Sequence, residues 1–338
     1  MLVIRNAETR DLEALVKLAA ILNSVNFPNQ PDVLKEQLEL SETSFAGRIK
    51  DPYEGHYIFV AEDTEGGEIL GSSMIFSRHG SPLAPHYYFE VLFEERYSHT
   101  LKKGFKHQIL RLRSNEDGPT ELGGFVIHPH ARGKGLGRPL SYVRLMYIGL
   151  HREKFKERIL AELLPPLTEE GKSLLWEAYG NKFTALSYKE ADYLSRKNKE
   201  FIGALFPQHD VYTCLFPPEV QEVIGEVGKD TVSVKAMLEE AGLRYLNQLD
   251  PFDGGPHFGA HLEDIRPLKE LKILSARMDT RKPASAPKGL VAVEKGHNFK
   301  TIVTVLHIEN DEIFLEPESM KALDIAPLEK VASMPLKM

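Results

Sequence analysis

The feature that most constrains this chain is the run Arg132-Gly133-Lys134-Gly135-Leu136-Gly137, which lies between an apolar segment and a predicted helix. Residues 122–127 favour a strand, and residues 139–151 favour a helix whose first turn accommodates Pro139. Glycines let the backbone approach a ligand closely, and the free amides of a helix N-terminus attract negative charge. Arg138 adds a further positive charge. The run therefore predicts an anion-binding turn.

Three kinds of anion-binding loop compete for this run. A Walker A loop requires Gly-x-x-x-x-Gly-Lys-Ser/Thr, and the residues around Lys134 do not match it. A Rossmann loop requires Gly-x-Gly-x-x-Gly at the start of a βαβ unit, whereas the spacing here is Gly-x-Gly-x-Gly after a predicted antiparallel hairpin. The third is the pyrophosphate loop of the GNAT acyl-CoA N-acyltransferases, Gln/Arg-x-x-Gly-x-Gly/Ala. Arg132-x-x-Gly135-x-Gly137 matches this pattern, and a glycine-rich turn without a ligand is the alternative.

The order of predicted elements indicates an α/β fold with a mixed sheet. A strand, two helices, an antiparallel hairpin turning at 65–67, a strand, a helix and a further strand follow one another. A helix that ends at a glycine before a strand is then predicted twice, with Gly180 and Gly242 as the C-caps. Either of these two helix–glycine–strand segments could be the one that completes the sheet domain. The predicted strands cover residues 2–4, 57–61, 69–76, 122–127 and 158–163.

The C-terminal part of the chain has a different composition. The segment 276–288 is rich in Arg, Lys, Pro, Ala and Ser and predicts a linker or an exposed loop. Short apolar strands follow it and predict a small β-rich domain. We therefore expect a domain over 1–265, with an insertion or a degenerate second copy at about 165–230, and a second domain over 266–338.

Composition limits the classes of function. The 338 residues carry a net charge of -7, which disfavours broad nucleic-acid or anionic-membrane binding. The single cysteine, Cys214, excludes an intrachain disulfide framework and a multi-cysteine metal site. His128 and His130 resemble a metal pair but have no third ligand near them in the sequence, so no metal is expected. The absence of an apolar leader or a membrane-length apolar run makes the cytoplasm the expected location.

Beyond the loop, the sequence resembles the arginine N-succinyltransferase family over nearly its whole length. The resemblance is carried by VIRNAETRDLEALVKLA, YIFVAED, FKERILAEL, FPQHDVYT, LEEAGLRY and, most specifically, DPFDGGP at 250–256. It implies a GNAT-like catalytic domain and a barrel-like C-terminal domain. It also implies succinyl-CoA as a co-substrate rather than a resident cofactor, the α-amine of arginine as acceptor, a role in arginine catabolism, and assembly into homo- or hetero-oligomers with family members.

The resemblance also assigns positions. The family's contact with succinyl-CoA falls on Phe125, and the position of the family's proton-donating histidine reads Gly228. The family's Gly-Leu-Thr-Ser-Leu-Pro loop near the substrate is replaced by residues 24–28, SVNFP. Both departures concern the acceptor or the acid chemistry, and they leave the coenzyme A interpretation intact.

Amine acyl transfer requires a base, a polarised thioester carbonyl and a proton for the leaving thiolate. The candidate catalytic residues are Glu121, Glu162 and His209, while the amides of Phe125 and Val126 are candidates to hold the carbonyl oxygen. Glu162 is also a candidate anchor for a cationic substrate, and a water-facing strand edge is its alternative role. The predicted coenzyme A contacts are Phe125, Val126, Arg132, Gly133, Lys134, Gly135, Gly137 and Arg138.

Asp253 is the second candidate for substrate binding. With Asp250 it flanks Phe252, and paired carboxylates bind a guanidinium group well. Turn chemistry with the following glycines is the alternative. Two other functions stay open: an N-acyltransferase with a different amine or acyl-CoA, and a non-catalytic coenzyme A-binding subunit that pairs with an active relative.

Overall fold

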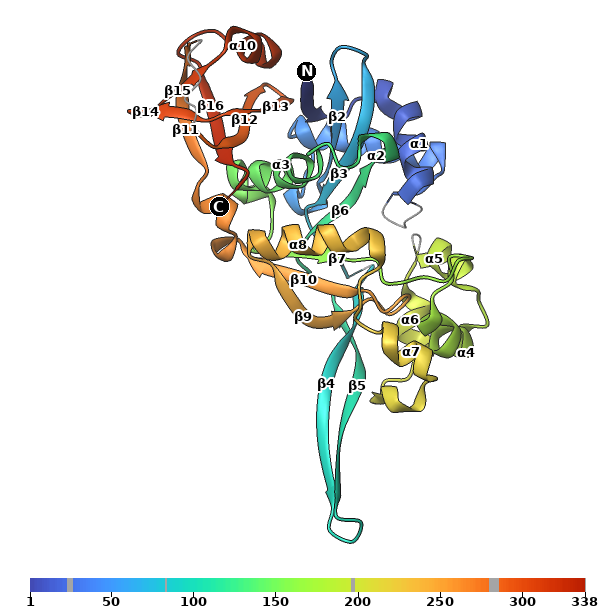
Figure 1. Cartoon of the computed structure of the whole chain (residues 1–338). Helices are drawn as coiled ribbons and strands as arrows, with labels where there is room; N and C mark the ends of the chain where they lie inside the picture. The colour runs from blue at the N-terminus through green and yellow to red at the C-terminus, as the bar shows by residue number, and fades with distance from the viewer. Residues whose placement is uncertain (23–26, 83, 196–197, 280–285, 338) are drawn as a thin grey trace. The chain divides into compact units, whose positions relative to one another are not determined.

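The computed structural model describes residues 1–22, 27–82, 84–195, 198–279 and 286–337, and these form two compact units (Figure 1). Unit 1 comprises residues 1–77, 120–157 and 261–338. Unit 2 comprises residues 78–119 and 158–260. The chain therefore passes from one unit to the other several times, and neither unit is a continuous stretch of sequence.

Unit 1 is built on a mixed sheet whose strand order is β14-β15-β11-β16-β12-β13-β1-β2-β3-β6. The strands nearest the glycine-rich loop are antiparallel neighbours, as the predicted hairpin requires. These strands are β1 (Leu2–Asn6), β2 (His56–Asp63), β3 (Glu68–Phe76), β6 (Thr120–Ile127), β11 (Lys272–Met278), β12 (Lys288–Lys295), β13 (Asn298–Val305), β14 (His307–Glu309), β15 (Glu312–Leu315) and β16 (Lys330–Pro335).

Helices cover both faces of this sheet, which explains why β2 is apolar at successive positions. Ile58 and Val60 pack into one apolar cluster with α1 (Leu12–Leu22) and α2 (Pro31–Phe45). Tyr57 and Phe59, whose side chains alternate with these, contact the ring of Tyr147 on α3 (Gly137–Leu150). A strand buried on both faces reads as a continuous apolar run, as YIFVA does.

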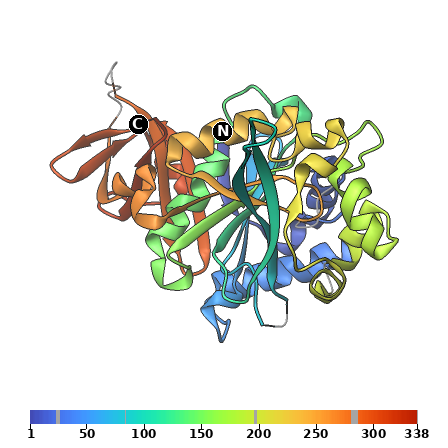
Figure 2. The same cartoon turned by 90° about the horizontal axis from the view of Figure 1, so that it is seen from below.

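The C-terminal strands belong to unit 1, which differs from the predicted division at residue 265. β13 pairs antiparallel with β1, so that Ile302 lies opposite Val3 and the strands of 289–315 extend the N-terminal sheet. The C-terminal part is β-rich, as expected, and packs its own apolar cluster together with α10 (Pro317–Leu323) (Figure 2, orange to red). The predicted linker is shorter than expected, because β11 extends to Met278 and β12 begins at Lys288. Residues 280–285 lie outside the described residues.

The strands of unit 2 follow the order β7-β10-β9-β4-β5-β8. β4 and β5 form a long hairpin that extends past β9 (Figure 1). The sequence predicted only strand pieces at 87–93 and 108–112 within it. The elements of unit 2 are β4 (His86–Ser98), β5 (Lys103–Asn115), β7 (Arg158–Glu162), a π-helical turn (Trp176–Gly180), α4 (Asn181–Thr184), α5 (Tyr188–Ser195), α6 (Glu200–Leu205), β8 (Val211–Tyr212), α7 (Pro218–Val223), α8 (Val232–Ala241), β9 (Arg244–Leu249) and β10 (Pro256–His261).

The two predicted glycine caps have different outcomes. Gly242 ends α8 with φ of 111°, in the left-handed region, so this prediction is confirmed. The prediction for Gly180 is wrong, since Gly180 is helical and α4 continues to Thr184. A Cβ at Gly180 would lie 2.4 Å from the ring of Trp176, so the glycine is required by close packing against the indole and not by a cap.

Candidate functional site

The predicted anion loop lies in unit 1, between β6 and α3. After a short 3-10 turn at Pro129–Ala131, Gly133 and Gly135 have φ of 75° and 81°. No described atom lies within 4 Å of a Cβ built on either glycine, so both face open space. The backbone conformation and the approach of a ligand, and not packing, are what favour glycine here. The loop leads directly into the first turn of α3, where the helix dipole is positive.

The basic side chains of the loop are engaged to different degrees. Arg132 is exposed and its Nε donates to the Ile127 carbonyl at 3.2 Å, while Lys134 is exposed. Arg138, expected at the phosphate site, instead donates to the Leu336 carbonyl at 2.9 Å. The backbone amides of the loop, with Lys134 beside them, are therefore better placed to meet an anion than the guanidinium of Arg138.

β6 contains a β-bulge immediately before this loop. In the pairing with β3, Ser72 lies opposite Val126 and Met74 lies opposite Gly123, so two residues of β6, Gly124 and Phe125, face one residue of β3. Such a bulge leaves a residue unpaired in the ladder and redirects its amide and side chain. Gly124 has φ of 54°, and a Cβ there would lie 2.5 Å from Met74. Both constraints favour glycine in the bulge.

A buried cation lies beside the bulge. Arg144 of α3 donates from Nη1 to the Gly123 carbonyl at 3.2 Å, and from Nε and Nη2 to the carbonyl and hydroxyl of Ser141. Its guanidinium lies 5.4 Å from the ring centre of Phe125. Burial lowers the pKa of Arg144 to about 9. Burial thus disfavours the charged form of this guanidinium, and an anionic group beside it would offset the free-energy cost of burying the charge.

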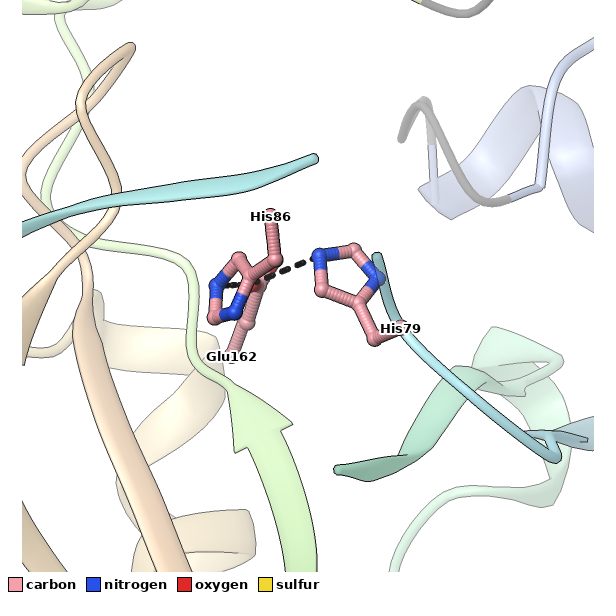
Figure 3. Close-up of side chains that lie close together, drawn as sticks. All are labelled: His79, His86 and Glu162. Carbon is pink, nitrogen blue, oxygen red and sulfur yellow. Dashed lines mark ion pairs between the residues drawn. The ribbon is translucent and has the colours of Figure 1, made fainter. Parts of the chain in front are cut away.

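Unit 2 contains a cluster of three histidines around a glutamate, which no local sequence pattern predicts. Nε2 of His79, His86 and His257 lies 3.5, 3.2 and 3.4 Å from the same atom, Oε1 of Glu162. Glu162 ends β7, His86 begins β4, His257 lies in β10, and His79 precedes β4. Figure 3 shows the rings of His79 and His86 turned toward the Glu162 carboxylate. The cluster forms only when distant segments fold together.

The electrostatics of this cluster fix the charge of its members. Burial alone would raise the pKa of Glu162, but His79, His257 and His86 outweigh it and hold that pKa well below its usual range. Burial, reinforced by His79, lowers the pKa of His86 to about 4. Glu162 is therefore a carboxylate and His86 a neutral imidazole near pH 7.

Asp250 and Asp253 lie in the turn between β9 and β10. Asp250 Oδ1 accepts hydrogen bonds from the amides of Phe252 and Asp253, and Asp253 Oδ1 accepts one from Gly255 at 2.7 Å. Burial, together with Glu162, raises the pKa of Asp250 to about 7, and burial and Asp250 raise that of Asp253 well above its usual range. The predicted turn chemistry is thus present, and the pair retains a proton near neutral pH.

The remaining predicted residues lie apart from this cluster. Glu121 is buried on β6 of unit 1, opposite Phe76. His209 is exposed in unit 2, next to Asp210, which pairs with Arg111 at 2.6 Å. Gly228 donates its amide to the Leu164 carbonyl at 2.8 Å, just beyond Glu162. Of the replaced family loop at 24–28, residues 24–26 lie outside the described residues, so that departure is not described.

One pocket of unit 1 lies away from every predicted site residue. It has a volume of about 650 Å³, and its lining includes Asn6, Arg10, Glu42 and His297. This hollow shares no residue with the glycine-rich loop or with the bulge. It therefore does not contribute to the donor site described above.

A bulged strand that delivers a glycine-rich turn to a helix N-terminus defines an acyl-CoA N-acyltransferase of the GNAT-like class. The chain belongs to the arginine N-succinyltransferase family: the family model described as "Arginine N-succinyltransferase beta subunit" matches residues 2–267. It is 31% identical to the arginine N-succinyltransferase of Citrobacter koseri and 30% identical to that of Escherichia coli, in each case over 96% of this chain and 94% of the relative.

The fold comparison agrees with the family assignment. The arginine/ornithine succinyltransferase subunit AI of Pseudomonas aeruginosa superimposes with a TM-score of 0.87 at 26% identity, covering 100% of this chain and 99% of that chain. The predicted α/β fold with a GNAT-like mixed sheet is confirmed, and so is the prediction of an acyl-CoA-dependent transferase. Every helix in the described ranges is too short or too polar to span a bilayer.

Proposed function

We propose that this protein transfers the succinyl group of succinyl-CoA to the α-amine of arginine, as a step of arginine catabolism in the cytoplasm. The amine nitrogen attacks the thioester carbon, the carbon–sulfur bond breaks, and an amide and the free thiol of coenzyme A form. The amine proton passes to a base and the thiolate takes up a proton. The observation that carries the proposal is the bulge at Gly124–Phe125, followed within one strand end by the loop at 132–137.

The donor determinants all belong to unit 1. The amides around Gly133 and Gly135 and the N-terminus of α3 would hold the pyrophosphate, with Lys134 adding charge. The amides of Phe125 and Val126 would hold the thioester oxygen as it gains negative charge. Glu121, four residues before Phe125 on the same strand, is the base that we favour. His209 has less support, because its exposed ring is part of no cluster that we identify among the described residues.

Arg144 supplies a reason for a succinyl rather than an acetyl donor. The guanidinium is buried beside Phe125 and uses three of its five N–H groups in the hydrogen bonds described above. A terminal carboxylate on the acyl chain would stabilise the charged form of Arg144, which burial disfavours. We expect Arg144→Gln to lose selectivity for succinyl-CoA over acetyl-CoA, while Arg138→Gln, whose guanidinium meets a backbone carbonyl, keeps it.

The acceptor determinants belong to unit 2. The guanidinium of arginine needs a carboxylate partner, since an unpaired buried cation costs several kcal/mol. Asp253 is the stronger candidate, because Glu162 already lies within 3.5 Å of three imidazoles. An arriving cation would favour ionisation of the Asp250–Asp253 pair and release its retained proton. Arginine binding is then tighter at higher pH.

Assembly with a second copy or a family member is part of this proposal. The hairpin of β4 and β5 pairs with β9 and β8 only near its base, at Phe89–Glu90 and Ile109–Leu110, among the described strands. Its outer part exposes Phe93, Tyr97, Leu101 and Phe105. An isolated two-stranded ribbon is marginally stable in water, so a partner covering these side chains would stabilise it. Sedimentation of a Phe93→Ser, Phe105→Ser variant should show dissociation.

The direct test is a thiol-release assay with purified protein, succinyl-CoA and arginine, and with acetyl-CoA or other amines in place of either substrate. Turnover that is highest for succinyl-CoA with arginine supports the proposal. Turnover that is highest with another amine or acyl-CoA would instead make the chain a different N-acyltransferase. Tight coenzyme A binding without turnover would favour the non-catalytic subunit.

A further inference from the structure

The histidine cluster of unit 2 has a geometry that the acyl transfer does not explain. Three imidazole nitrogens surround one carboxylate oxygen at 3.2–3.5 Å. His86 and His257 are buried, with 3% and 0% of their surface exposed. The rings also lie close to one another: the centres of His79 and His86 are 4.4 Å apart and those of His86 and His257 are 5.4 Å apart.

Hydrogen bonding alone accounts poorly for this arrangement. A carboxylate oxygen has two lone pairs and cannot accept three well-directed N–H bonds from the same side. Nε2 of His86 makes no well-formed hydrogen bond to any residue that the structure describes, although Glu162 Oε1 is 3.2 Å away. Buried polar nitrogens of this kind normally make a well-directed hydrogen bond, so a nitrogen that faces other ligand atoms without one calls for an explanation.

A metal ion explains the arrangement. Zn²⁺ binds imidazole and carboxylate at about 2.0–2.1 Å in a tetrahedron, which separates neighbouring ligand atoms by roughly 3.3 Å. The distances from Nε2 of His79 and of His86 to Glu162 Oε1, 3.5 and 3.2 Å, fall at that separation. Ligand atoms of His79, His86 and Glu162 all lie within 4.8 Å of one another. We propose that His79, His86 and Glu162 bind one divalent transition-metal ion of the zinc class, with the fourth position open to another ligand. His257, which also lies beside Glu162 Oε1, would hold that carboxylate in place.

The ligand set restricts the metal. Neutral imidazoles with one carboxylate suit Zn²⁺, Co²⁺ or Ni²⁺, whereas Mg²⁺ and Ca²⁺ prefer oxygen ligands alone. Glu162, Asp250 and His257 form an overlapping group of the same size. We favour the histidine-rich set because Asp250 Oδ1 already accepts two backbone amides, which commits it to the turn. His79 and Glu162, the least buried members, give an ion a route of entry.

The site would join segments of unit 2 that are far apart in the sequence. It links the segment before β4 and the first residue of β4 to the end of β7. Its role is therefore to fix these segments. The sequence predicts no metal here, because no two of these residues have the close spacing of a metal motif. The inference does not rest on the proposed function, so loss of acyl transfer would not disprove it.

The test uses full-length protein treated with a chelator and then titrated with Co²⁺ alone, followed by the visible absorption of four-coordinate cobalt. We expect one ion per chain, and Zn²⁺ should displace it. His86→Gln should weaken Co²⁺ binding by on the order of 100-fold. The matched control is His130→Gln in unit 1. His130 Nε2 also lies 3.4 Å from a glutamate, Glu68, and has His128 beside it, but it is exposed. This variant should bind Co²⁺ as the wild type does.

Thermal melting distinguishes a variant that has lost the metal site from one that does not fold. Zn²⁺ should raise the melting temperature of the wild type and of His130→Gln by roughly 5 °C, and should leave those of His86→Gln and Glu162→Gln unchanged. Equal Co²⁺ affinity in folded His86→Gln and His130→Gln would overturn the proposal. So would a wild type that shows no cobalt absorption and no shift with Zn²⁺.

Discussion

Units 1 and 2 form their candidate sites by different means. In unit 1 the site is mainly backbone: two glycines with positive φ, a bulge, and a helix N-terminus within a few residues of one another. In unit 2 it consists of side chains, and His79, Glu162 and His257 come from three distant segments. A backbone site leaves a contiguous motif in the sequence, whereas a side-chain site formed by tertiary contacts leaves none.

The largest expected effect breaks the backbone site. Gly135→Asp should weaken coenzyme A binding by on the order of 100-fold or more, because a side chain and a negative charge would meet the pyrophosphate. The measurement is isothermal titration calorimetry. Gly296→Asp is the matched control, since Gly296 also has positive φ, 63°, and also faces open space. Both variants carry the same backbone strain of about 1 kcal/mol, so equal coenzyme A affinities would show that strain alone matters.

The next effect concerns the carboxylates of unit 2. Asp253→Asn should raise the dissociation constant for arginine about 10–100-fold, since a charge-assisted hydrogen bond is lost. In the wild type that constant should fall as pH rises through about 7. The raised pKa values of the pair mean that a proton must leave before the cation is fully paired. Asp210→Asn, at an exposed carboxylate paired with Arg111, is the control and should bind arginine normally.

A smaller effect concerns Gly228, the position of the missing family histidine. A Cβ there would lie 2.8 Å from the Pro165 carbonyl oxygen, so even alanine requires the backbone to shift. Gly228→Ala should cost about 1–3 kcal/mol in the free energy of unfolding. Gly66→Ala, in an open turn, should cost far less. If urea unfolding showed that both variants lose the same free energy of unfolding, the close approach of Gly228 to the Pro165 carbonyl would not contribute to stability.

This contact also changes the expectation for a restored histidine. Because the family has a proton-donating histidine at this position, its resemblance to this chain implies that Gly228→His would increase the rate of transfer. The close approach to Pro165 predicts instead that Gly228→His destabilises the fold, as would any substitution that adds a side chain at this position. A stable and faster Gly228→His enzyme would contradict this account of the position.

The smallest effect compares a buried histidine of unit 1 with an exposed histidine of unit 2. His56 in unit 1 stacks on Phe76 at 4.3 Å between ring centres, and burial lowers its pKa to about 3. The unfolded chain therefore takes up the proton first, and stability falls as pH drops below about 6.5 by about 1.4 kcal/mol per pH unit. His56→Phe should remove this contribution, so that the free energy of unfolding falls less steeply between pH 6.5 and 4, while the contribution of buried His86 remains. His99→Phe, at an exposed histidine, should leave the slope unchanged in urea unfolding.

The sequence was most informative where structure depends on neighbouring residues. The hairpin at 57–76, the strand, loop and helix of 122–150 and the cap at Gly242 follow from local periodicity and glycine placement. The long β4–β5 hairpin was missed in part because its outer residues are exposed and do not alternate. Gly180 was misread because a glycine required by packing and one required by positive φ look the same in a sequence.

The site divides in the same way. A contiguous pattern predicts the loop residues 132–137 as a site, and a family position predicts Phe125. His79, His86 and His257 were not found, because only the pairing of β7, β10 and β4 into one sheet brings them to Glu162. The sequence shows each of these residues only as a histidine in or beside a strand. Many exposed histidines have the same sequence context, so it does not identify a site.

The most direct test of the central claim, that unit 1 recognises the donor and unit 2 the acceptor, is a crossed calorimetric titration. Coenzyme A and arginine are each titrated into Gly135→Asp and into Asp253→Asn. The account predicts that Gly135→Asp loses coenzyme A but binds arginine within about twofold of wild type, and that Asp253→Asn does the reverse. Loss of both ligands in either folded variant, or of neither, would contradict the account.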